Sequence, residues 1–209
     1  MNNRWNQLIY RMWAPIYDVF FNRGSFRVAR KKVFTNLPFK QGDQILFVGV
    51  GTGADLEYIP HHEFNITAID YSYDMLEKAR RKYSQASITF QQMDAEHLNL
   101  PADQFDFVIG SLILSVVPNP YQALHEMMRV TKPGGQIILF DKFAPEGASL
   151  SFFKKILRPV IQLLGTDIGL SFGNIIQQQN RAHILSDEDM MFQGMYRKIV
   201  LEKRTSYAS

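Results

Sequence analysis

Three glycines and one aspartate are the first residues whose types and spacing could do chemistry. Gly49, Gly51 and Gly53 form a Gly-Val-Gly-Thr-Gly segment directly after an apolar run. Glycines let a ligand approach the backbone closely, because no side chain stands in the way. Asp70 stands 21 residues after Gly49, at the end of the next apolar run. There its two carboxylate oxygens could accept both hydroxyls of a ribose. This pattern predicts a nucleotide-type binding loop.

A second carboxylate, Asp94, ends the third apolar run and is expected at the same edge. Two acids beside a glycine loop would hold a ribose and an adenine amino group while repelling phosphates. Adenosine without a pyrophosphate is therefore the better ligand. Each acid also has a structural alternative: Asp70 could cap the next helix, a task that Ser72 could equally perform, and Asp94 could lie in a surface turn.

A nicotinamide-dependent oxidoreductase is the main rival among enzymes. Gly49, Gly51 and Ala54 satisfy the Gly-x-Gly-x-x-Ala pattern that such enzymes use to seat a pyrophosphate, and the rival also shares Asp70. It leaves Asp94 unexplained, as well as the later segment Lys-Pro-Gly-Gly at 132–135.

Short apolar runs and helical patterns alternate along the chain and must position these residues. Five runs have strand length, at residues 44–48, 65–69, 88–90, 105–109 and 136–140. Helical patterns cover residues 54–59, 72–83 and 121–130. This alternation predicts an α/β, Rossmann-like doubly wound sheet, mostly parallel, which binds ligands at the carboxyl ends of its strands.

The two ends of the chain have different patterns. The first 40 residues are expected to form two or three helices, with Pro15 breaking the first. Residues 151–164 are expected to be an amphipathic helix, residues 165–180 irregular, and residues 195–202 a closing antiparallel strand.

Length and composition limit the remaining possibilities. A chain of 209 residues with 46% hydrophobic and 21% charged residues is typical of one globular domain. It has no cysteine, which excludes disulfides, thiolate metal sites and thiol nucleophiles. The five histidines show no ligand spacing, so we expect no metal, and His125 should face outward on its helix. Lacking a long apolar segment, the protein is expected to be cytoplasmic.

Positive charge is concentrated near the N-terminus. The net charge is +3, yet residues 1–40 hold eight Lys or Arg against one acid, Asp18. Aromatic residues interleave with these cations: Trp5, Trp13, Phe20, Phe21 and Phe26. Such a segment could meet lipid head groups or nucleic acid. Alternatively it is a solvated helix face whose aromatics pack on the core.

As a set, five motifs over residues 40–141 resemble the class I S-adenosylmethionine-dependent methyltransferases. They are Gly49-x-Gly-x-Gly53, the strand-terminal Asp70, Asp94-Ala95, Phe105-Asp-Phe-Val-Ile109 and Lys132-Pro-Gly-Gly135. The resemblance implies a seven-stranded sheet with an antiparallel C-terminal strand, preceded by N-terminal helices. It also implies S-adenosyl-L-methionine as cofactor and S-adenosyl-L-homocysteine as product.

The resemblance assigns roles to individual residues. The glycine loop, Gly49, Val50, Gly51, Thr52 and Gly53, would line the methionine and ribose. Asp70 would bind the ribose hydroxyls, Asp94 and Ala95 the adenine edge, while Tyr71 and Met75 would flank the ring and Ser111 would lie near the methionine. Lys132-Pro-Gly-Gly135 would be a structural turn. The chain departs from the family at Phe47, where an acid usually orients the loop and the methionine ammonium; Asp18, Asp141 or backbone carbonyls could substitute.

A finer resemblance concerns the methyl acceptor. Four segments look like the bacterial phosphatidylethanolamine N-methyltransferases and, more loosely, the ubiquinone/menaquinone-biosynthesis methyltransferases: residues 13–18, 45–53, 114–120 and 129–135. Both groups act on lipidic acceptors, so we expect contact with an anionic membrane rather than nucleic acid. However, Asp141-Lys-Phe143 stands where the lipid enzymes tend to carry Asn-His-Phe. Other small acceptors, and a binding protein without turnover, remain alternatives.

The resemblance also suggests how the chain is divided and which residues act on the acceptor. Residues 1–209 would form one domain, with a helical lid or membrane-facing segment at 1–40, a cofactor core at 41–145 and a substrate-side helix with closing strands at 146–209. Tyr17 would cover the sulfonium, and Lys142 and Tyr10 would contact the acceptor. Each tyrosine could instead be core packing.

Overall fold

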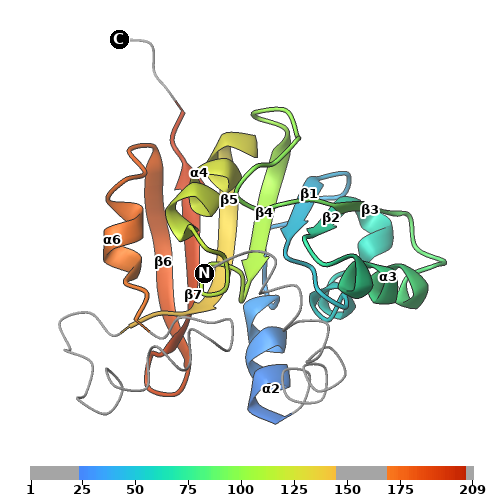
Figure 1. The fold of residues 1–209 in the computed structure, drawn as a ribbon, viewed down its shortest axis with the longest axis horizontal. Coiled ribbons are helices and arrows are strands. Elements are labelled where there is room, and N and C mark those ends of the chain that lie inside the picture. Colours follow the sequence, from blue (N-terminus) through green and yellow to red (C-terminus); the bar gives the residue numbers. More distant parts are fainter. Residues whose placement is uncertain (1–23, 145–168, 206–209) are drawn as a thin grey trace.

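A seven-stranded sheet forms the centre of the computed structural model, which describes residues 24–144 and 169–205 (Figure 1). The strand order is β3-β2-β1-β4-β5-β7-β6. The strands are β1 Gln44–Val48, β2 Asn65–Asp70, β3 Ile88–Gln92, β4 Phe105–Ser111, β5 Thr131–Lys142, β6 Ala182–Met191 and β7 Tyr196–Lys203. Strands β1 to β5 pair in parallel, and β7 runs antiparallel to both β5 and β6. The predicted fold class is confirmed.

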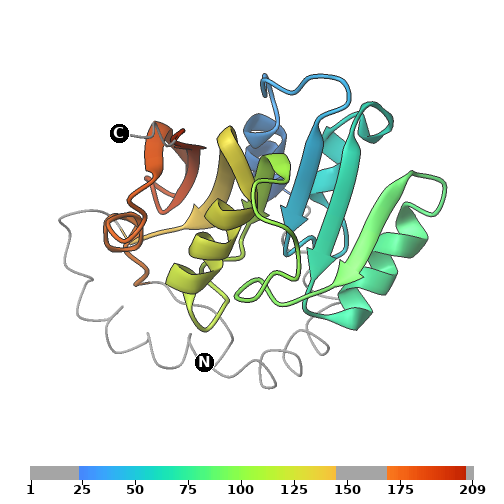
Figure 2. The same cartoon turned by 90° about the horizontal axis from the view of Figure 1, so that it is seen from above.

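Helices cover both faces of this sheet, and Figure 2 shows α2 and α4 on opposite sides of it. The helices are α2 Gly24–Val33, α3 Tyr73–Lys82, α4 Pro120–Val130 and α6 Phe172–Ile176, with 3₁₀ turns η1 Asp55–Tyr58 and η2 His61–Glu63. One apolar cluster joins α2 and α3 to the sheet through Val33 and Leu76. The other joins α4 and α6 through Leu124 and Phe172. The sheet therefore lies between two apolar layers.

Burial explains why the parallel strands were predictable. Four consecutive residues of β1 are buried, because β1 lies inside the sheet with helices on both faces. Such strands have continuous apolar runs rather than an alternating pattern. The edge strand β3 has no fully buried residue, and its sequence Ile-Thr-Phe-Gln-Gln is correspondingly more polar.

The two long helices after β2 and β4 also match their predictions. Ser72 caps α3, since its Oγ accepts a hydrogen bond from the Met75 backbone N–H at 3.4 Å. Asn119 caps α4 by accepting from the Gln122 N–H at 3.2 Å. The predicted inward residues are buried: Met75, Leu76 and Ala79 on α3, and Leu124, Met127 and Met128 on α4. His125 is exposed on α4, as expected.

Some elements differ from their predictions in type or in bounds: β3 and β4 each end two residues later than expected, at Gln92 and Ser111. The helix expected at 54–59 is only the 3₁₀ turn η1, which is bounded by Gly53 with φ +80° and by Pro60. Strand β5 begins at Thr131, five residues earlier than expected. Its partners on β4 are Phe105 for Thr131 and Phe107 for Gln136, so the Lys-Pro-Gly-Gly segment at 132–135 forms an irregularity within the strand.

The C-terminal part contains a strand that the sequence did not reveal. Strand β6 is a mostly exposed edge strand whose pairing with β7 shifts register twice. These shifts remove the regular alternation by which a strand is recognised. Residues 165–180 were expected to be irregular, but within their described part Ser171 caps the short helix α6. Strand β7 confirms the predicted closing strand within one residue at each end.

Other predictions fall outside the described residues. They include the break at Pro15 and the amphipathic helix at 151–164. Among the described residues, no helix is long and apolar enough to cross a membrane.

Candidate functional site

The strand order reverses direction between β1 and β4, next to the glycine loop. From β1 the chain proceeds through β2 to β3 on one side, and then returns to place β4 on the other side of β1. In doubly wound sheets such a switch point opens a crevice at the carboxyl ends of the strands. The loop after β1 and the ends of β2 and β4 therefore share the edge at which this fold binds ligands.

The glycine loop is tied to the end of β2. The N–H groups of Gly49 and Val50 both donate to the Ile69 carbonyl at 2.9 Å. Gly51 has φ +56°, a conformation that favours glycine, and a Cβ placed on it would meet no atom within 4 Å. A Cβ on Gly53 would come within 2.7 Å of the Tyr83 ring, whose hydroxyl donates to the Gly53 carbonyl at 2.9 Å. The contacts with Ile69 and Tyr83 thus hold the loop in place, and the space next to the Cα of Gly51 is open.

Asp70 points toward this loop. Its Oδ2 accepts a hydrogen bond from the Gly51 N–H at 2.8 Å, and its Oδ1 accepts one from the Ser72 N–H at 2.8 Å. Burial raises the pKa of Asp70, and the two backbone hydrogen bonds partly oppose that shift. Each carboxylate oxygen has a second lone pair with which to accept a hydroxyl hydrogen. Because Ser72 caps α3, the helix-capping alternative for Asp70 is not needed.

The segment after β3 lies beside Asp70. The Met93 N–H donates to the Asp70 carbonyl at 3.0 Å, which brings Asp94 to the edge already occupied by the glycine loop. Asp94 Oδ1 accepts from the Glu96 N–H at 2.9 Å, and Ala95 is buried. On the β2 side, the carbonyl of Tyr71 accepts from Gln92 Nε2 at 3.0 Å. Asp70 therefore contacts the loop, whereas Asp94 follows the next strand in a turn closed by the His97 N–H, which donates to the Asp94 carbonyl at 3.1 Å.

The end of β4 contributes an unusual hydroxyl. Ser111 Oγ is buried but has no hydrogen-bond partner among the described residues. Buried hydroxyls nearly always have a partner, so Ser111 Oγ has hydrogen-bonding capacity that no described residue uses. Close by, a Cβ on Gly49 would come within 2.7 Å of the Ile113 side chain, which leaves room there only for glycine.

Comparison with known proteins identifies the family. A methyltransferase domain family matches residues 46–139. A phosphatidylethanolamine N-methyltransferase from Cereibacter sphaeroides is 34% identical over 160 residues, which cover 75% of this chain and 77% of that protein. The chain belongs to the class I S-adenosylmethionine-dependent methyltransferases.

Other relatives of this methyltransferase act on a different kind of molecule, as their names state. A demethylmenaquinone methyltransferase from Paenarthrobacter aurescens is 34% identical over 131 residues, or 61% of this chain. One from Listeria monocytogenes is 31% identical over 147 residues, or 66% of this chain. The chain spans only 51% and 62% of these two relatives.

Solved structures agree on the methyltransferase fold. A Haloferax volcanii protein described as a putative methyltransferase, solved in complex with the Trm112 methyltransferase activator, has a TM-score of 0.80 at 15% identity and covers 97% of this chain. A putative methyltransferase from Bacillus halodurans has a TM-score of 0.72 at 17% identity and covers 84% of this chain. At such identities the likeness concerns the fold alone.

The residues at the edge fit S-adenosylmethionine, the cofactor of this family. The cofactor carries ribose hydroxyls as donors, and Asp70 retains acceptor capacity beside the loop. It carries no phosphate, and two acids at the edge suit a ligand without phosphates. The open space over Gly51 and the unpartnered Ser111 Oγ are compatible with a ligand that runs from β2 to β4.

Phe47 of this methyltransferase is a core residue. It is buried, and its ring stacks on Phe34 with the centroids 6.3 Å apart. Its side chain packs in the apolar cluster that contains α2. Asp141, one proposed substitute for the missing acid, alternates with Phe140 along β5 and so faces the layer that contains α4. It does not occupy the place of Phe47. Asp18 lies outside the described residues.

Asp141 itself is a buried carboxylate at the carboxyl edge. Its Oδ2 accepts from the Ser115 N–H at 3.2 Å, and its Oδ1 accepts from the Lys142 N–H at 2.8 Å. Burial raises the pKa of Asp141, and the hydrogen bonds with Ser115 and Lys142 oppose that shift. The carboxylate thus fixes the loop that follows β4.

Of the residues predicted to act on the acceptor, the structure describes only Lys142. Lys142 lies on β5 opposite Tyr196 of β7 and is only 9% exposed. Tyr10 and Tyr17 lie outside the described residues. No group of three or more potential metal ligands occurs among the described residues.

Sequence reasoning missed a buried ion pair beside the glycine loop. Arg30 of α2 pairs with Asp55, two residues after Gly53, and both side chains are less than 10% exposed. The partners are 25 residues apart on different elements, and no motif connects them. The sequence had counted Arg30 only as one cation of the basic segment. The pair attaches α2 to the start of η1.

Proposed function

We propose that this methyltransferase acts on a lipidic acceptor, with a phospholipid head-group amine as the preferred choice. The observation that carries the proposal is the similarity to the Cereibacter sphaeroides enzyme. It extends over 75% of the chain, well beyond the domain match at 46–139. The elements outside that domain are the ones available to select an acceptor.

We further propose how the cofactor is held. Asp70 accepts the ribose hydroxyls, while Asp94 and Ala95 contact the adenine edge, and Tyr71 and Met75 flank its ring. Ser111 lies near the methionine. The whole glycine loop, with Gly49, Val50, Gly51, Thr52 and Gly53, lies beneath the ribose and methionine. The position of Asp70, hydrogen-bonded to the Gly51 N–H, supports this arrangement.

The chemistry needs positioning more than it needs a catalytic group. S-adenosylmethionine supplies a methyl group bonded to a positively charged sulfur. The nitrogen lone pair of the acceptor forms the new C–N bond as the C–S bond breaks, the electron pair stays on sulfur, and the nitrogen loses a proton to solvent. Holding the two reactants in line can supply most of the acceleration, roughly 7–11 kcal/mol in well-oriented systems. We propose that Tyr17 covers the sulfonium and that Lys142 contacts the acceptor.

A quinone-type acceptor is the second candidate. The demethylmenaquinone methyltransferases among the relatives favour it, at similar identity but over a smaller share of the chain. In both cases the acceptor is embedded in a bilayer, so we propose peripheral contact with a membrane. We also propose that residues 1–209 form one domain, with residues 1–40 as a lid or membrane-facing segment.

Transfer of a labelled methyl group distinguishes these acceptors. Vesicles of phosphatidylethanolamine and phosphatidylglycerol, with or without a demethylmenaquinone analogue, would be incubated with the protein and methyl-labelled S-adenosylmethionine. The lipids would then be separated by chromatography. We expect label in N-methylated phosphatidylethanolamine. Label only in the quinone would replace the first candidate with the second, and label in neither would reject a lipidic acceptor. Asp70→Asn should lower the amount of label, whereas its matched control Asp74→Asn, which changes an exposed acid on α3, should not.

A further inference from the structure

The two most exposed large apolar side chains of the described residues belong to neighbouring elements. Val28 on α2 is 71% exposed, and Phe192, between β6 and β7, is 58% exposed. Phe26 of α2 connects the elements, because its ring lies 6.3 Å from the ring of Phe192 and 5.1 Å from that of Tyr196. Isolated exposed apolar residues are ordinary, but two on adjoining elements call for an explanation.

Helix α2 has two chemically distinct faces. Its inner face buries Ala29, Arg30 and Val33. Its outer face exposes Arg27, Val28, Lys31 and Lys32, so three cations surround one apolar side chain. The helix contains no acid, and none of these three cations forms an ion pair with another described residue. This outer face is cationic with an apolar centre.

Residues 190–195 at the tip of the β6–β7 hairpin carry no charged side chain, although the carboxylate of Asp189 lies beside Gly194 there. Residues 190–195 read Met-Met-Phe-Gln-Gly-Met. Phe192 adopts φ +55°, which is uncommon for a bulky residue, and its ring lies 5.8 Å from the ring of Tyr196. The acids of β6 precede this tip, and Asp187 among them is paired with Arg197. The turn therefore holds an aromatic side chain outward at a defined place.

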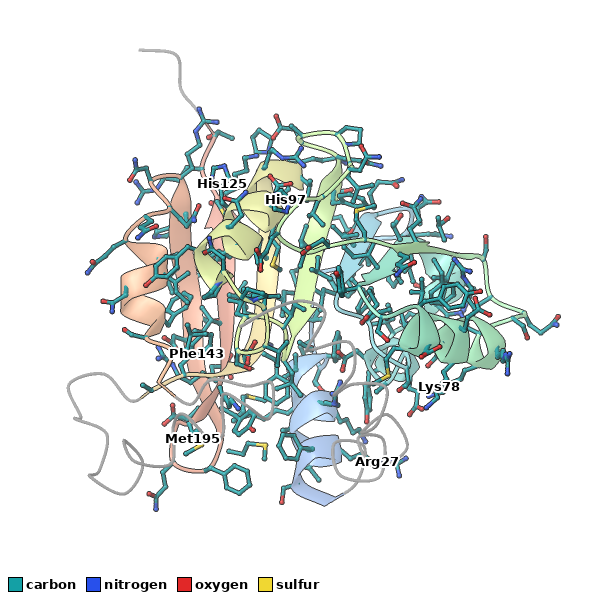
Figure 3. The ribbon with its side chains drawn as sticks, in the orientation of Figure 1. Arg27, Lys78, His97, His125, Phe143 and Met195 are labelled. Atoms are coloured by element: carbon teal, nitrogen blue, oxygen red, sulfur yellow. The ribbon has the colours of Figure 1, made fainter. Side chains whose placement is uncertain are left out.

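Both elements lie toward the edge that carries the cofactor site. The Phe143 N–H, just after β5, donates to the Met195 carbonyl at 2.8 Å, so the hairpin tip adjoins the carboxyl end of β5. Helix α2 is attached to η1, directly after the glycine loop, through Arg30 and Asp55. In Figure 3, Arg27, Phe143 and Met195 lie toward one end of the molecule, and His97 and His125 lie toward the other.

We propose that the outer face of α2, made of Arg27, Val28, Lys31 and Lys32, docks on an anionic lipid bilayer, and that Phe192 reaches the same bilayer from the neighbouring hairpin tip. Cations held near anionic head groups gain about 1 kcal/mol each, and apolar side chains can enter the interface beside them. Charge complementarity selects a lipid surface over an apolar protein groove. The inference deepens the proposed function, because a bilayer docked there would present its lipids at the edge where methyl transfer is expected.

Vesicle sedimentation of the full chain tests the surface without any need for methyl transfer. Vesicles of phosphatidylcholine with 30% phosphatidylglycerol, a composition chosen to give about the surface charge of anionic membranes, would be compared with pure phosphatidylcholine at low and high salt. We expect retention on the anionic vesicles at low salt only. The double charge reversal Arg27→Glu/Lys31→Glu should weaken retention at least tenfold, an order-of-magnitude expectation of ~1 kcal/mol for each lost cation.

Helix α3 offers matched controls. Lys78→Glu/Arg81→Glu makes the same charge change at exposed positions of a helix that also contains Asp74 and Glu77. For the apolar part, Phe192→Asn keeps a residue that tolerates positive φ, and Tyr73→Asn removes an aromatic side chain that is similarly exposed, at 56%. We expect the α2 and Phe192 variants to lose retention and the α3 variants to keep it. Thermal unfolding of each variant would verify that it folds.

Three outcomes would overturn the proposal. The first is an equal loss of vesicle retention in the α2 and α3 charge variants, which would indicate only an effect of net charge. The second is retention that does not change in any α2 or Phe192 variant. The third is a concentration-dependent dimer that Phe192→Asn abolishes, which would assign the surface to a second copy of the chain. Retention on these vesicles, combined with no label in phosphatidylethanolamine in the methyl-transfer assay, would leave docking intact and reject the phospholipid acceptor, so the two proposals can fail separately.

Discussion

The carboxyl edge of this sheet has two regions that differ in the direction in which their polar and apolar groups point. Around β1, β2 and β4, polar groups are turned inward and tied together, as in the contact of Asp70 with the Gly51 N–H. At α2 and the β6–β7 hairpin, the cations Arg27 and Lys31 and the apolar Phe192 are turned outward. The first arrangement suits a small molecule that the protein encloses, and the second suits a surface that the protein meets.

The ion pair between Arg30 and Asp55 joins these two regions, and its removal should have the largest effect. Arg30→Met leaves Asp55 buried without its partner, which should lower the free energy of unfolding by about 3–5 kcal/mol. Chemical denaturation would measure the loss. The double variant Arg30→Met/Asp55→Leu should recover most of it, because no buried charge is then left unpaired. Wild-type stability in the single variant would show that α2 is not anchored to the cofactor edge.

Acid should weaken cofactor binding through Asp70. Burial raises the pKa of Asp70 above its ordinary value of 3.8, so the carboxylate is neutralised at a higher pH than an exposed aspartate. Because the ionised form is the one proposed to accept the ribose hydroxyls, affinity for S-adenosylhomocysteine should be constant near neutral pH and fall as pH drops through the raised pKa. The fall should approach about tenfold per pH unit below it.

Calorimetric titrations between neutral and acidic pH would measure this profile. Asp70→Asn should show weak binding with a flatter profile, since the titrating group is gone. If the affinity for S-adenosylhomocysteine falls equally with decreasing pH in wild type and in Asp70→Asn, the pH dependence belongs to another group.

A smaller effect is expected at Ser111, and it should separate binding from stability. Its Oγ is buried without a partner among the described residues, so Ser111→Ala should leave the free energy of unfolding unchanged or slightly higher. If the cofactor supplies the missing partner, Ser111→Ala should also weaken the binding of S-adenosylhomocysteine by about fivefold to tenfold. This loss of affinity is equivalent to roughly one hydrogen bond. Thermal unfolding with and without ligand would measure both. A loss of stability with no loss of affinity would contradict the assignment.

The same division into two regions explains what the sequence could predict. Strands β1 and β2 were predicted within one residue, because β1 has four consecutive buried residues and β2 buries Ile66, Ala68 and Ile69 within a short apolar segment. The proximity of Asp70 to the glycine loop follows from a general property of parallel sheets, whose strands end at a common edge. These features depend on local sequence and on few topological choices.

Features that depend on distant partners were not predictable. The pairing of Arg30 with Asp55 requires knowledge of where α2 packs. Phe47 was recognised as a departure from the family, but only its stacking on Phe34 shows that the site of the usual acid has become core. Strand β6 escaped detection because its register shifts and its run of acids hide the strand pattern. The exposure of Phe192 depends on the geometry of that hairpin.

The central claim is that Asp70 and the glycine loop together hold the nucleoside of S-adenosylmethionine. Calorimetric titration of S-adenosylhomocysteine into wild type, Asp70→Asn and the exposed control Asp74→Asn tests it most directly. Asp70→Asn should weaken binding by roughly 10- to 100-fold, as expected for lost hydrogen bonds to a charged group, and Asp74→Asn should match wild type. Equal affinity in all three proteins would show that the ligand is bound elsewhere and would contradict the account.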